Sequence, residues 1–325
     1  MPHRHFLTTA DWSRPEIEAL LADAATLKAG RRKTRVTSLA GKSIALVFFN
    51  PSLRTRTSFE IGAFEMGGHA VVLEPGKGAW PIEFREGVVM DGEAEEHVGE
   101  VAKVLSRYCD LIAVRAFPKF QRWEDDREDL VIRRFAEHAT VPVINMETIT
   151  HPMQELALAL TLKERLGTTD GKSFLLTWTY HPRPLNTAVA NSAALIAKKM
   201  GFKVKLLCPT PEYRLDERYM DDIEVTHDIE SAYRGADVVY AKSWGALPYF
   251  GRWEDEKKIR DEYKHFIVDE KKMALTPNAF FSHCLPLRRD VKATTEVVTG
   301  PRSLVIEEAE NRLHVQKAVM RALVS

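Results

Sequence analysis

The feature that most constrains this chain is a change of hydrophobic period that recurs along its length. Short apolar runs such as Ser43–Phe49 and Phe174–Trp178 have the length and composition of strands that are buried on both faces. Longer segments with helical periodicity follow such runs, and Arg54–Met66, for example, ends at Gly67. Repeated alternation of strand and helix predicts an α/β protein with mostly parallel sheets.

The alternation stops and restarts near residues 147–151, and 325 residues are enough for two domains. We therefore predict two doubly wound parallel-sheet domains. The first comprises residues 1–148 and a C-terminal helix, 308–325, that packs back on it, and the second comprises residues 149–307.

The sequence also predicts two further helices, a short strand and an unusually short crossover. Helical patterns cover Glu95–Tyr108 and Trp123–His138, and Leu304–Ile306 has the composition of a short strand. Between the strands at Cys208 and Ile223 only Leu215–Asp222 reads as helical, which is short for a crossover between parallel strands. A genuine short crossover and a loss of residues from this segment both explain that length.

Composition excludes several classes of protein. The 46 basic residues balance the 46 acidic ones, so the chain lacks the electrostatic signature of a protein that binds nucleic acid or an anionic membrane. No apolar run approaches the ~20 residues of a transmembrane helix. The three cysteines are widely spaced, which argues against a disulfide framework and a cysteine zinc site and predicts a cytoplasmic protein. The dinucleotide motif G-x-G-x-x-G is missing, and we expect neither a cofactor nor a metal.

The strongest chemical signal is the string N-P-S-L-R-T-R-T-S at residues 50–58, between a predicted strand and a predicted helix. Open α/β sheets bind ligands at the carboxyl ends of their strands, and a helix start offers unpaired N–H groups. Hydroxyl groups and the guanidiniums of Arg54 and Arg56 would add the donors that a phosphate dianion needs. A simpler interpretation is an N-cap serine followed by two solvated arginines, but the whole string favours an anion site.

Two further strings carry polar groups of the right kind. His151-Pro152-Met153-Gln154 starts a predicted helix at the joint between the domains, and His283-Cys284-Leu285-Pro286 follows a predicted strand. Taken alone, the first string could be a helix start with a capping imidazole, and the second a loop with a buried cysteine.

In this order and spacing the three strings resemble the transcarbamylase family, which transfers a carbamoyl group from carbamoyl phosphate to an amine. The resemblance covers nearly the whole chain, and it implies a homotrimer and a knot in the second domain. The residues implied to bind carbamoyl phosphate are Ser52, Leu53, Arg54, Thr55, Trp80, Arg115, His151, Pro152, Met153, Gln154, Cys284, Leu285 and Arg312. The catalytic group among them is Thr55, Arg115, His151, Gln154 and Cys284. Trp80 would reach a neighbouring subunit's site, although a tryptophan in a surface loop is the simpler interpretation.

Charge indicates which amine is accepted. Family members that use ornithine carry an aspartate where this chain has Lys242, and that aspartate receives the α-ammonium group. Two unit charges about 4 Å apart interact by roughly 4 kcal/mol at an effective dielectric constant of ~20. Turning that attraction into repulsion would weaken ornithine binding by about three powers of ten or more. Lys242 therefore favours an N-acylated ornithine, whose α-nitrogen carries no charge.

The pattern is most similar to the branch of the family that acts on N-acetylornithine. By this resemblance Glu147, Lys242 and Leu285 would bind the acylated amino acid, and Lys292 would be carboxylated, although a solvated lysine is the simpler interpretation. A sister branch for N-succinylornithine has proline at the position of Glu95, whose carboxylate would repel the succinyl group. A glutamate in the first turn of a helix is the simpler interpretation of Glu95. A succinyl-specific enzyme and a non-catalytic protein that binds carbamoyl phosphate are the alternatives.

Overall fold

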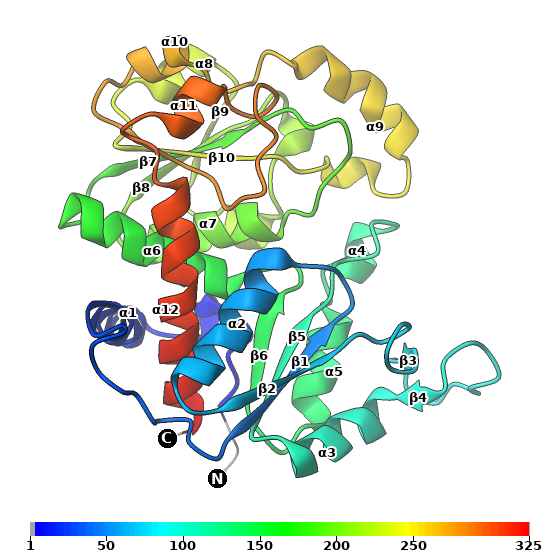
Figure 1. Ribbon diagram of the computed structural model, residues 1–325. Helices are drawn as coiled ribbons and strands as arrows, with labels where there is room; N and C mark the ends of the chain where they lie inside the picture. The colour runs from blue at the N-terminus through cyan, green and yellow to red at the C-terminus, as the bar shows by residue number, and fades with distance from the viewer. Residues whose placement is uncertain (1–3, 325) are drawn as a thin grey trace. The chain divides into compact units, whose positions relative to one another are not determined.

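The computed structural model describes residues 4–324 (Figure 1). They form two compact units. Unit 1 contains the described residues up to Pro118, Arg127–Met153 and the residues from Arg312 onward, and unit 2 contains Lys119–Asp126 and Gln154–Asn311. In the described part of the chain, no helix combines the length and the apolar character that crossing a membrane requires.

Unit 1 is built on a parallel sheet with the strand order β2-β1-β5-β6. Its strands are β1 (Ser43–Phe48), β2 (His69–Leu73), β5 (Leu111–Arg115) and β6 (Val143–Glu147). The chain moves from β1 to one side and then returns to the other, so the direction of winding reverses between β1 and β5. Ligands of open α/β sheets bind outside the carboxyl ends of the strands at such a reversal.

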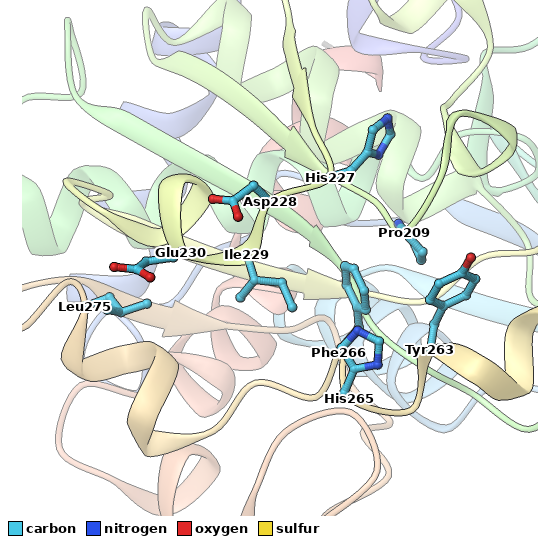
Figure 2. A pocket seen from close by; sticks show the side chains of 9 residues that line it. All are labelled: Pro209, His227, Asp228, Ile229, Glu230, Tyr263, His265, Phe266 and Leu275. Carbon is cyan, nitrogen blue, oxygen red and sulfur yellow. The ribbon is translucent and has the colours of Figure 1, made fainter.

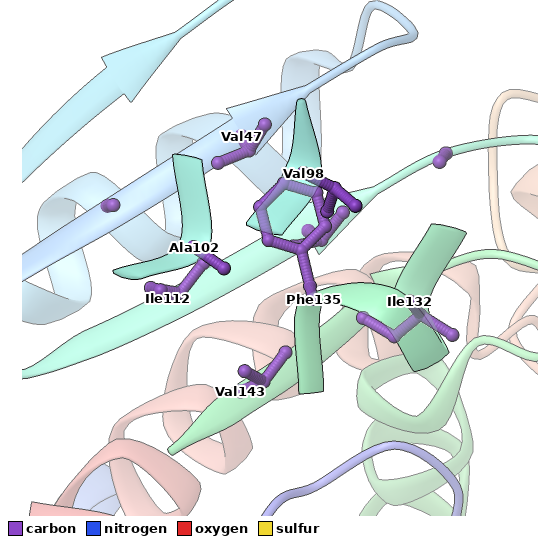
Figure 3. Packing of buried hydrophobic residues seen from close by; sticks show 10 residues of the cluster. Val47, Val98, Ala102, Ile112, Ile132, Phe135 and Val143 are labelled. Carbon is purple, nitrogen blue, oxygen red and sulfur yellow. The ribbon is translucent and has the colours of Figure 1, made fainter. Parts of the chain in front are cut away.

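Helices cover both faces of this sheet. They are α1 (Arg14–Ala29), α2 (Leu53–Glu65), α3 (Val98–Tyr108), α5 (Leu130–His138) and the part of α12 (Val305–Val324) that belongs to unit 1. On one face, α3 and α5 bury Val98, Ala102 and Phe135 against the strands (Figure 3). Elsewhere in the unit, α2 lies close to α12 at Gly62, where an added Cβ atom would come within 3.3 Å of the Met320 side chain. The two helices can therefore pack closely, which lets Thr55 on α2 and Arg312 on α12 lie near each other.

Unit 2 is a second parallel sheet, with the strand order β11-β10-β7-β8-β9. Its strands are β7 (Ser173–Trp178), β8 (Lys203–Leu207), β9 (Glu224–Thr226), β10 (Val238–Lys242) and β11 (Phe280–Ser282). Its α-helices include α6 (Pro152–Leu166, from Gln154 on), α7 (Ala188–Lys199), α8 (Ile229–Tyr233), α9 (Trp253–Arg260), α10 (Glu270–Ala274) and α11 (Thr295–Thr299). Winding reverses between β7 and β10, so Lys242 ends a strand at the reversal. Both sheets confirm the predicted α/β class.

Some predicted elements are wrong. The single helix predicted over Trp123–His138 is two helices, α4 (Trp123–Asp126) and α5, and Asp129 between them has a left-handed φ of 53°. A left-handed residue interrupts a right-handed helix, which charge patterning alone does not reveal. The strand predicted over Leu304–Ile306 is instead the start of α12. Because Val305 and Ile306 are β-branched, their composition favoured a strand, but the helical residues that follow decide the conformation.

Two other segments also differ from prediction. Helix α3 begins at Val98, because Glu96–His97 form a short strand, β4, that pairs with β3 (Ile82–Glu83). Between β8 and β9 the predicted helical stretch is replaced by two 3₁₀ turns, Pro211–Tyr213 and Glu217–Tyr219. In the described chain this crossover is therefore short and contains no α-helix.

Candidate active site

The first turn of α2 has the properties of an anion site. Ser52 is its N-cap, and its Oγ accepts a hydrogen bond from the backbone N–H of Thr55 at 3.1 Å. Leu53 follows with a side chain that is 77% exposed, and Arg54 is half-buried. Asn50 ties this turn to the loop after β5, because its Oδ1 accepts from the N–H of Phe117 at 2.6 Å. The helix start thus presents N–H groups and a partial positive charge at the reversal of the sheet.

Two guanidinium groups converge on the hydroxyl of Thr55. Arg115 Nη1 donates to Thr55 Oγ1 at 3.3 Å, and Arg312 Nη2 donates to the same atom at 2.5 Å. All three residues are less than a tenth exposed. Arg56, the second arginine of the sequence string, instead pairs with Glu60 and Glu74, and its side chain is 44% exposed. The guanidiniums that join the helix start therefore come from β5 and α12.

One acidic side chain lies among these cations. Glu147 Oε2 is 2.5 Å from Arg115 Nη1 and 3.5 Å from His151 Nε2. Glu147 and His151 are both buried. The guanidinium of Arg115 also lies over the ring of Phe117, 4.6 Å from its centroid. The two guanidiniums of Arg115 and Arg312 outnumber the one carboxylate of Glu147, so this cluster is net positive, which favours an anionic ligand.

The HPMQ string begins α6 as predicted. Pro152 is its first residue, and Pro152, Met153 and Gln154 are all buried. In unit 2 the amide nitrogen of Gln154 donates to Glu308. The structure thus places His151 in the cluster around Thr55 and fixes Gln154 in a separate network of buried polar groups.

A second cationic cluster lies in unit 2, at the end of β10. Lys242 Nζ donates to the sulfur of Cys284 at 3.5 Å. The next residue, Leu285, has a φ of 48°, and its N–H donates to His283 Nδ1 at 3.0 Å. The lysine and the cysteine that the sequence predicted for substrate binding therefore lie in contact.

Lys292 is only 2% exposed, so its interpretation as a solvated lysine is wrong. Burial is the largest cause that lowers the pKa of its ammonium group to about 7, and the charge of Lys242 is the next. Arg288 acts in the same direction, whereas a Cys284 thiolate would raise this pKa. The positive charges of Lys242 and Lys292 thus repel each other, and the Lys292 side chain is buried.

Two of the predicted residues lie on exposed segments of unit 1. Trp80 is 65% exposed in the segment before β3. Glu95 is exposed in the loop before β4, so its interpretation as a first-turn helix residue is wrong. Among the described residues, no hydrogen bond or ion pair links either side chain to the cluster around Thr55.

Sequence reasoning missed three buried or paired polar residues in unit 2. Arg288 Nε donates to His181 Nε2 at 3.1 Å, and burial is the largest cause that lowers the pKa of His181 to about 4. Glu308 is fully buried and accepts the side-chain hydrogen bond of Gln154. Arg288 lies four positions after Cys284, and His181 follows the carboxyl end of β7, so both stood where ligands were expected. Glu308 gave no such signal, because its role depends on a contact between distant segments.

A cavity of about 470 Å³ in unit 2 is separate from these residues. It lies beyond the carboxyl ends of β8 and β9, and His227, Tyr263, His265 and Phe266 are among the side chains that line it (Figure 2). None of the predicted site residues lines it. The clusters around Thr55 and Lys242 are therefore the better candidates for the chemistry that the sequence predicts.

Comparison with known families identifies the group to which the chain belongs. Residues 4–164 match the carbamoyl-phosphate-binding domain of aspartate/ornithine carbamoyltransferase, and residues 183–323 match its aspartate/ornithine-binding domain. The chain belongs to the aspartate/ornithine carbamoyltransferase family. The predicted resemblance to transcarbamylases is thus confirmed.

Within this family, the chain is more similar to some carbamoyltransferases than to others. The N-acetylornithine carbamoyltransferase of Xanthomonas campestris pv. campestris is 66% identical, with 100% of this chain and 98% of that protein covered. The N-succinylornithine carbamoyltransferase of Bacteroides fragilis is 37% identical, with 95% of each covered. The Xanthomonas alignment extends over 337 positions, more than the 325 residues of this chain, so that carbamoyltransferase has residues without a counterpart here.

Solved structures of transcarbamylases are also similar to this chain. An acetylornithine transcarbamylase complexed with acetylcitrulline has a TM-score of 0.97 and 66% identity, covering 99% of each chain. A variant N-acetyl-L-ornithine transcarbamylase, in which a glutamate is replaced by proline, is complexed with carbamyl phosphate and N-succinyl-L-norvaline. Its TM-score is 0.96, again with 66% identity, and it covers 98% of this chain and 99% of that one.

Proposed function

We propose that this chain transfers the carbamoyl group of carbamoyl phosphate to the δ-amine of N-acetyl-L-ornithine, giving N-acetyl-L-citrulline and phosphate for arginine synthesis. The likeness to N-acetylornithine carbamoyltransferases over the full chain supports this activity. The single structural observation that carries the choice of amine is the contact between Lys242 and Cys284 at the end of β10. By the family resemblance, this ammonium group stands where relatives that use ornithine have a carboxylate.

Carbamoyl phosphate binds at the cluster around Thr55. Its phosphate dianion meets the first-turn N–H groups after Ser52 and the guanidinium of Arg54. Arg115 and Arg312, which already donate to Thr55, supply further N–H groups. Desolvated cations need an anion in such a buried place, and a phosphate satisfies that need. The predicted set of contacts also includes Leu53, Trp80, His151, Pro152, Met153, Gln154, Cys284 and Leu285.

The acylated amino acid binds at the cluster around Lys242. Its α-carboxylate is attracted by the ammonium group of Lys242, whereas the α-ammonium group of free ornithine would be repelled by it. The acyl cap removes the charge of the α-nitrogen. Charge alone therefore favours an N-acylated ornithine over ornithine by about three powers of ten, as estimated from the sequence.

The reaction then needs three things from the protein. The δ-amine must lose its proton, since an alkylammonium has a pKa near 10.4, and its desolvation favours the neutral form. The carbamoyl oxygen gains negative charge as nitrogen attacks carbon, and Arg115, His151 and Thr55 stabilise that charge, worth about 3–4 kcal/mol per donor in other enzymes. The C–N bond forms, the bond from carbon to the phosphate oxygen breaks, and the amine proton leaves with phosphate. Gln154 and Cys284 complete the catalytic set.

Glu147 is assigned to substrate binding by the family resemblance. Its ion pair with Arg115 adds a second task, because it holds the guanidinium in place before carbamoyl phosphate arrives. A carboxylate that positions an arginine reduces the entropy lost when the ligand binds.

Lys292 is proposed to be carboxylated. A lysine whose pKa is about 7 is largely neutral at slightly alkaline pH, and only a neutral amine attacks CO₂. The new N–C bond forms as nitrogen loses a proton, which leaves a carbamate anion in place of a buried cation. That anion attracts Lys242 instead of repelling it.

Glu95 is proposed to select acetyl over succinyl. Its carboxylate is exposed on a loop and repels a second carboxylate on the acyl group, while a neutral acetyl group is unaffected. A solved carbamoyltransferase in which a glutamate is replaced by proline holds N-succinyl-L-norvaline, which supports this role for a glutamate in the family.

A homotrimer is proposed in which Trp80 reaches the site of a neighbouring subunit. The large exposed fraction of this indole fits that role, because an aromatic ring gains most when a partner covers it. A cytoplasmic location and the absence of nucleic-acid and membrane partners stay predictions from the composition.

The test is a comparison of three amines with carbamoyl phosphate. We expect fast formation of the citrulline-type product from N-acetylornithine, slow formation from N-succinylornithine and almost none from ornithine. Lys242→Met should raise the rate with ornithine relative to N-acetylornithine, because it removes a repulsive charge. Faster turnover of ornithine by the unchanged enzyme would contradict the charge argument. No product from any amine would favour a non-catalytic protein that binds carbamoyl phosphate.

A further inference from the structure

Glu308, which has no part in the proposed chemistry so far, lies at the centre of a buried network in unit 2. It is in the first turns of α12 and is 0% exposed. Its Oε1 accepts from the hydroxyl of Tyr240 at 3.1 Å and from the amide nitrogen of Gln154. Its Oε2 accepts from the hydroxyl of Ser282. Strands β10 and β11 and helices α6 and α12 thus meet at one carboxylate.

The chemistry of a carboxylate fixes which way the Gln154 amide faces. The nitrogen of Gln154 donates to Oε1 of Glu308, so the NH₂ end of the amide faces this carboxyl group. The amide oxygen is then turned to the other side of the same planar group. That oxygen is buried and has no hydrogen-bond partner among the described residues. A buried acceptor without a partner costs free energy, which a donor on a ligand would recover.

The carbamoyl group carries such a donor. Its NH₂ has two N–H bonds to give, whereas Arg115, Arg312 and their neighbours around Thr55 are themselves mainly donors and suit the phosphate and carbonyl oxygens. A hydrogen-bond acceptor on the protein can therefore distinguish a carbamoyl group from an acyl group of the same shape, because only the carbamoyl group has N–H bonds to donate. Acetyl phosphate has a methyl group in place of NH₂ and would leave the acceptor unpaired.

We propose that Glu308 is a positioning residue that orients the amide of Gln154 so that its oxygen accepts a hydrogen bond from the carbamoyl NH₂. This inference rests on the proposed function, which assigns carbamoyl phosphate to Gln154. It adds selectivity: the chain discriminates carbamoyl phosphate from acetyl phosphate through Glu308, which does not itself touch the ligand.

The test compares two constants in variants of the full-length enzyme: the KM for carbamoyl phosphate and the inhibition constant for acetyl phosphate as a competitor. Glu308→Met should raise the KM about tenfold or more and change the inhibition constant less than threefold. Glu308→Gln should keep near-normal values, because its side-chain oxygen can accept from Gln154 and its NH₂ can donate to Ser282. Tyr240→Phe and Ser282→Ala are matched controls that remove the other bonds to Glu308, and both should change the ratio of the constants much less than Glu308→Met.

A double variant separates positioning from general stability. Gln154→Ala alone should raise the KM for carbamoyl phosphate, and adding Glu308→Met should raise it little further if Glu308 acts through Gln154. Equal changes in both constants, or a full additional loss in the double variant, would overturn the proposal. If Glu308→Met does not fold, Glu308→Asp replaces it. This variant withdraws the carboxylate by one carbon, and the ratio of the KM to the inhibition constant should rise, but less than expected for Glu308→Met; an unchanged ratio would overturn the proposal.

The outcomes also separate this proposal from the proposed function. If the unchanged enzyme forms no carbamoylated product, the proposed function fails, and the role of Glu308 fails with it. If the enzyme is active but the ratio of the two constants does not depend on Glu308, only the positioning role is refuted.

Discussion

Replacing Lys292 with methionine should stabilise the protein in buffer free of CO₂. The folded state holds the pKa of Lys292 at about 7, whereas the ordinary value is 10.5. At 1.36 kcal/mol for each pH unit, the difference corresponds to roughly 5 kcal/mol of folding free energy lost by burying this amine. Methionine is apolar and of similar length, so it removes the charge with a small change of packing.

The sign of the pH dependence follows from the same two values. Between about pH 7 and pH 10.5 the unfolded chain binds a proton on Lys292 that the folded chain does not. Stability of the unchanged protein therefore rises with pH over this interval. The advantage of Lys292→Met should be largest, at most about 5 kcal/mol, below pH 7 and should disappear toward pH 10.5.

Urea denaturation at fixed protein concentration measures this difference at pH 6, 8 and 10. A matched control is Lys317→Met, because Lys317 is also 2% exposed but is paired with Glu65 at 2.9 Å. Its removal should destabilise the protein, by about 1–3 kcal/mol. Bicarbonate at pH 8 should stabilise the unchanged protein and leave Lys292→Met unaffected, since only the lysine can be carboxylated. The reasoning is refuted if Lys292→Met is no more stable than the unchanged protein at pH 6, or if its advantage does not fall with pH.

Three further predictions concern specificity, assembly and the cationic cluster. Glu95→Pro should raise turnover of N-succinylornithine relative to N-acetylornithine about tenfold or more, and unchanged selectivity would exclude a role for Glu95. Trp80→Ala and His151→Ala should each lose most activity, but subunits of the two variants mixed after mild dissociation should regain part of it; no recovery would argue against sharing between subunits. Glu147→Gln should lower the free energy of unfolding by about 3–5 kcal/mol, because it leaves the buried charge of Arg115 without its partner, and urea denaturation checks this.

The fold class and the chemistry of the first helix start could be read from the sequence because they depend on local patterns. Short apolar runs such as Ser43–Phe48 favour buried strands, and the helix that follows this strand is capped by its own Ser52. Local patterns failed where a single backbone angle decides, as at Asp129, whose left-handed conformation divides one expected helix into two. They also failed at Val305, where a short β-branched run belongs to a long helix. The knot, which the resemblance alone implies, stays a prediction.

By itself, the sequence determined that this is an α/β carbamoyltransferase with a lysine where relatives that use ornithine have an acid. Only the tertiary structure decided which charged groups become neighbours. Arg312 joins Thr55 across more than 250 positions of the chain, and Glu308 reaches Gln154 across 154. The sequence also could not tell that Lys292 is buried, because one charged residue in a loop has no periodicity to indicate its surroundings. Burial changes the pKa of an amine through the loss of water, and that loss is a property of the packed chain rather than of the residue.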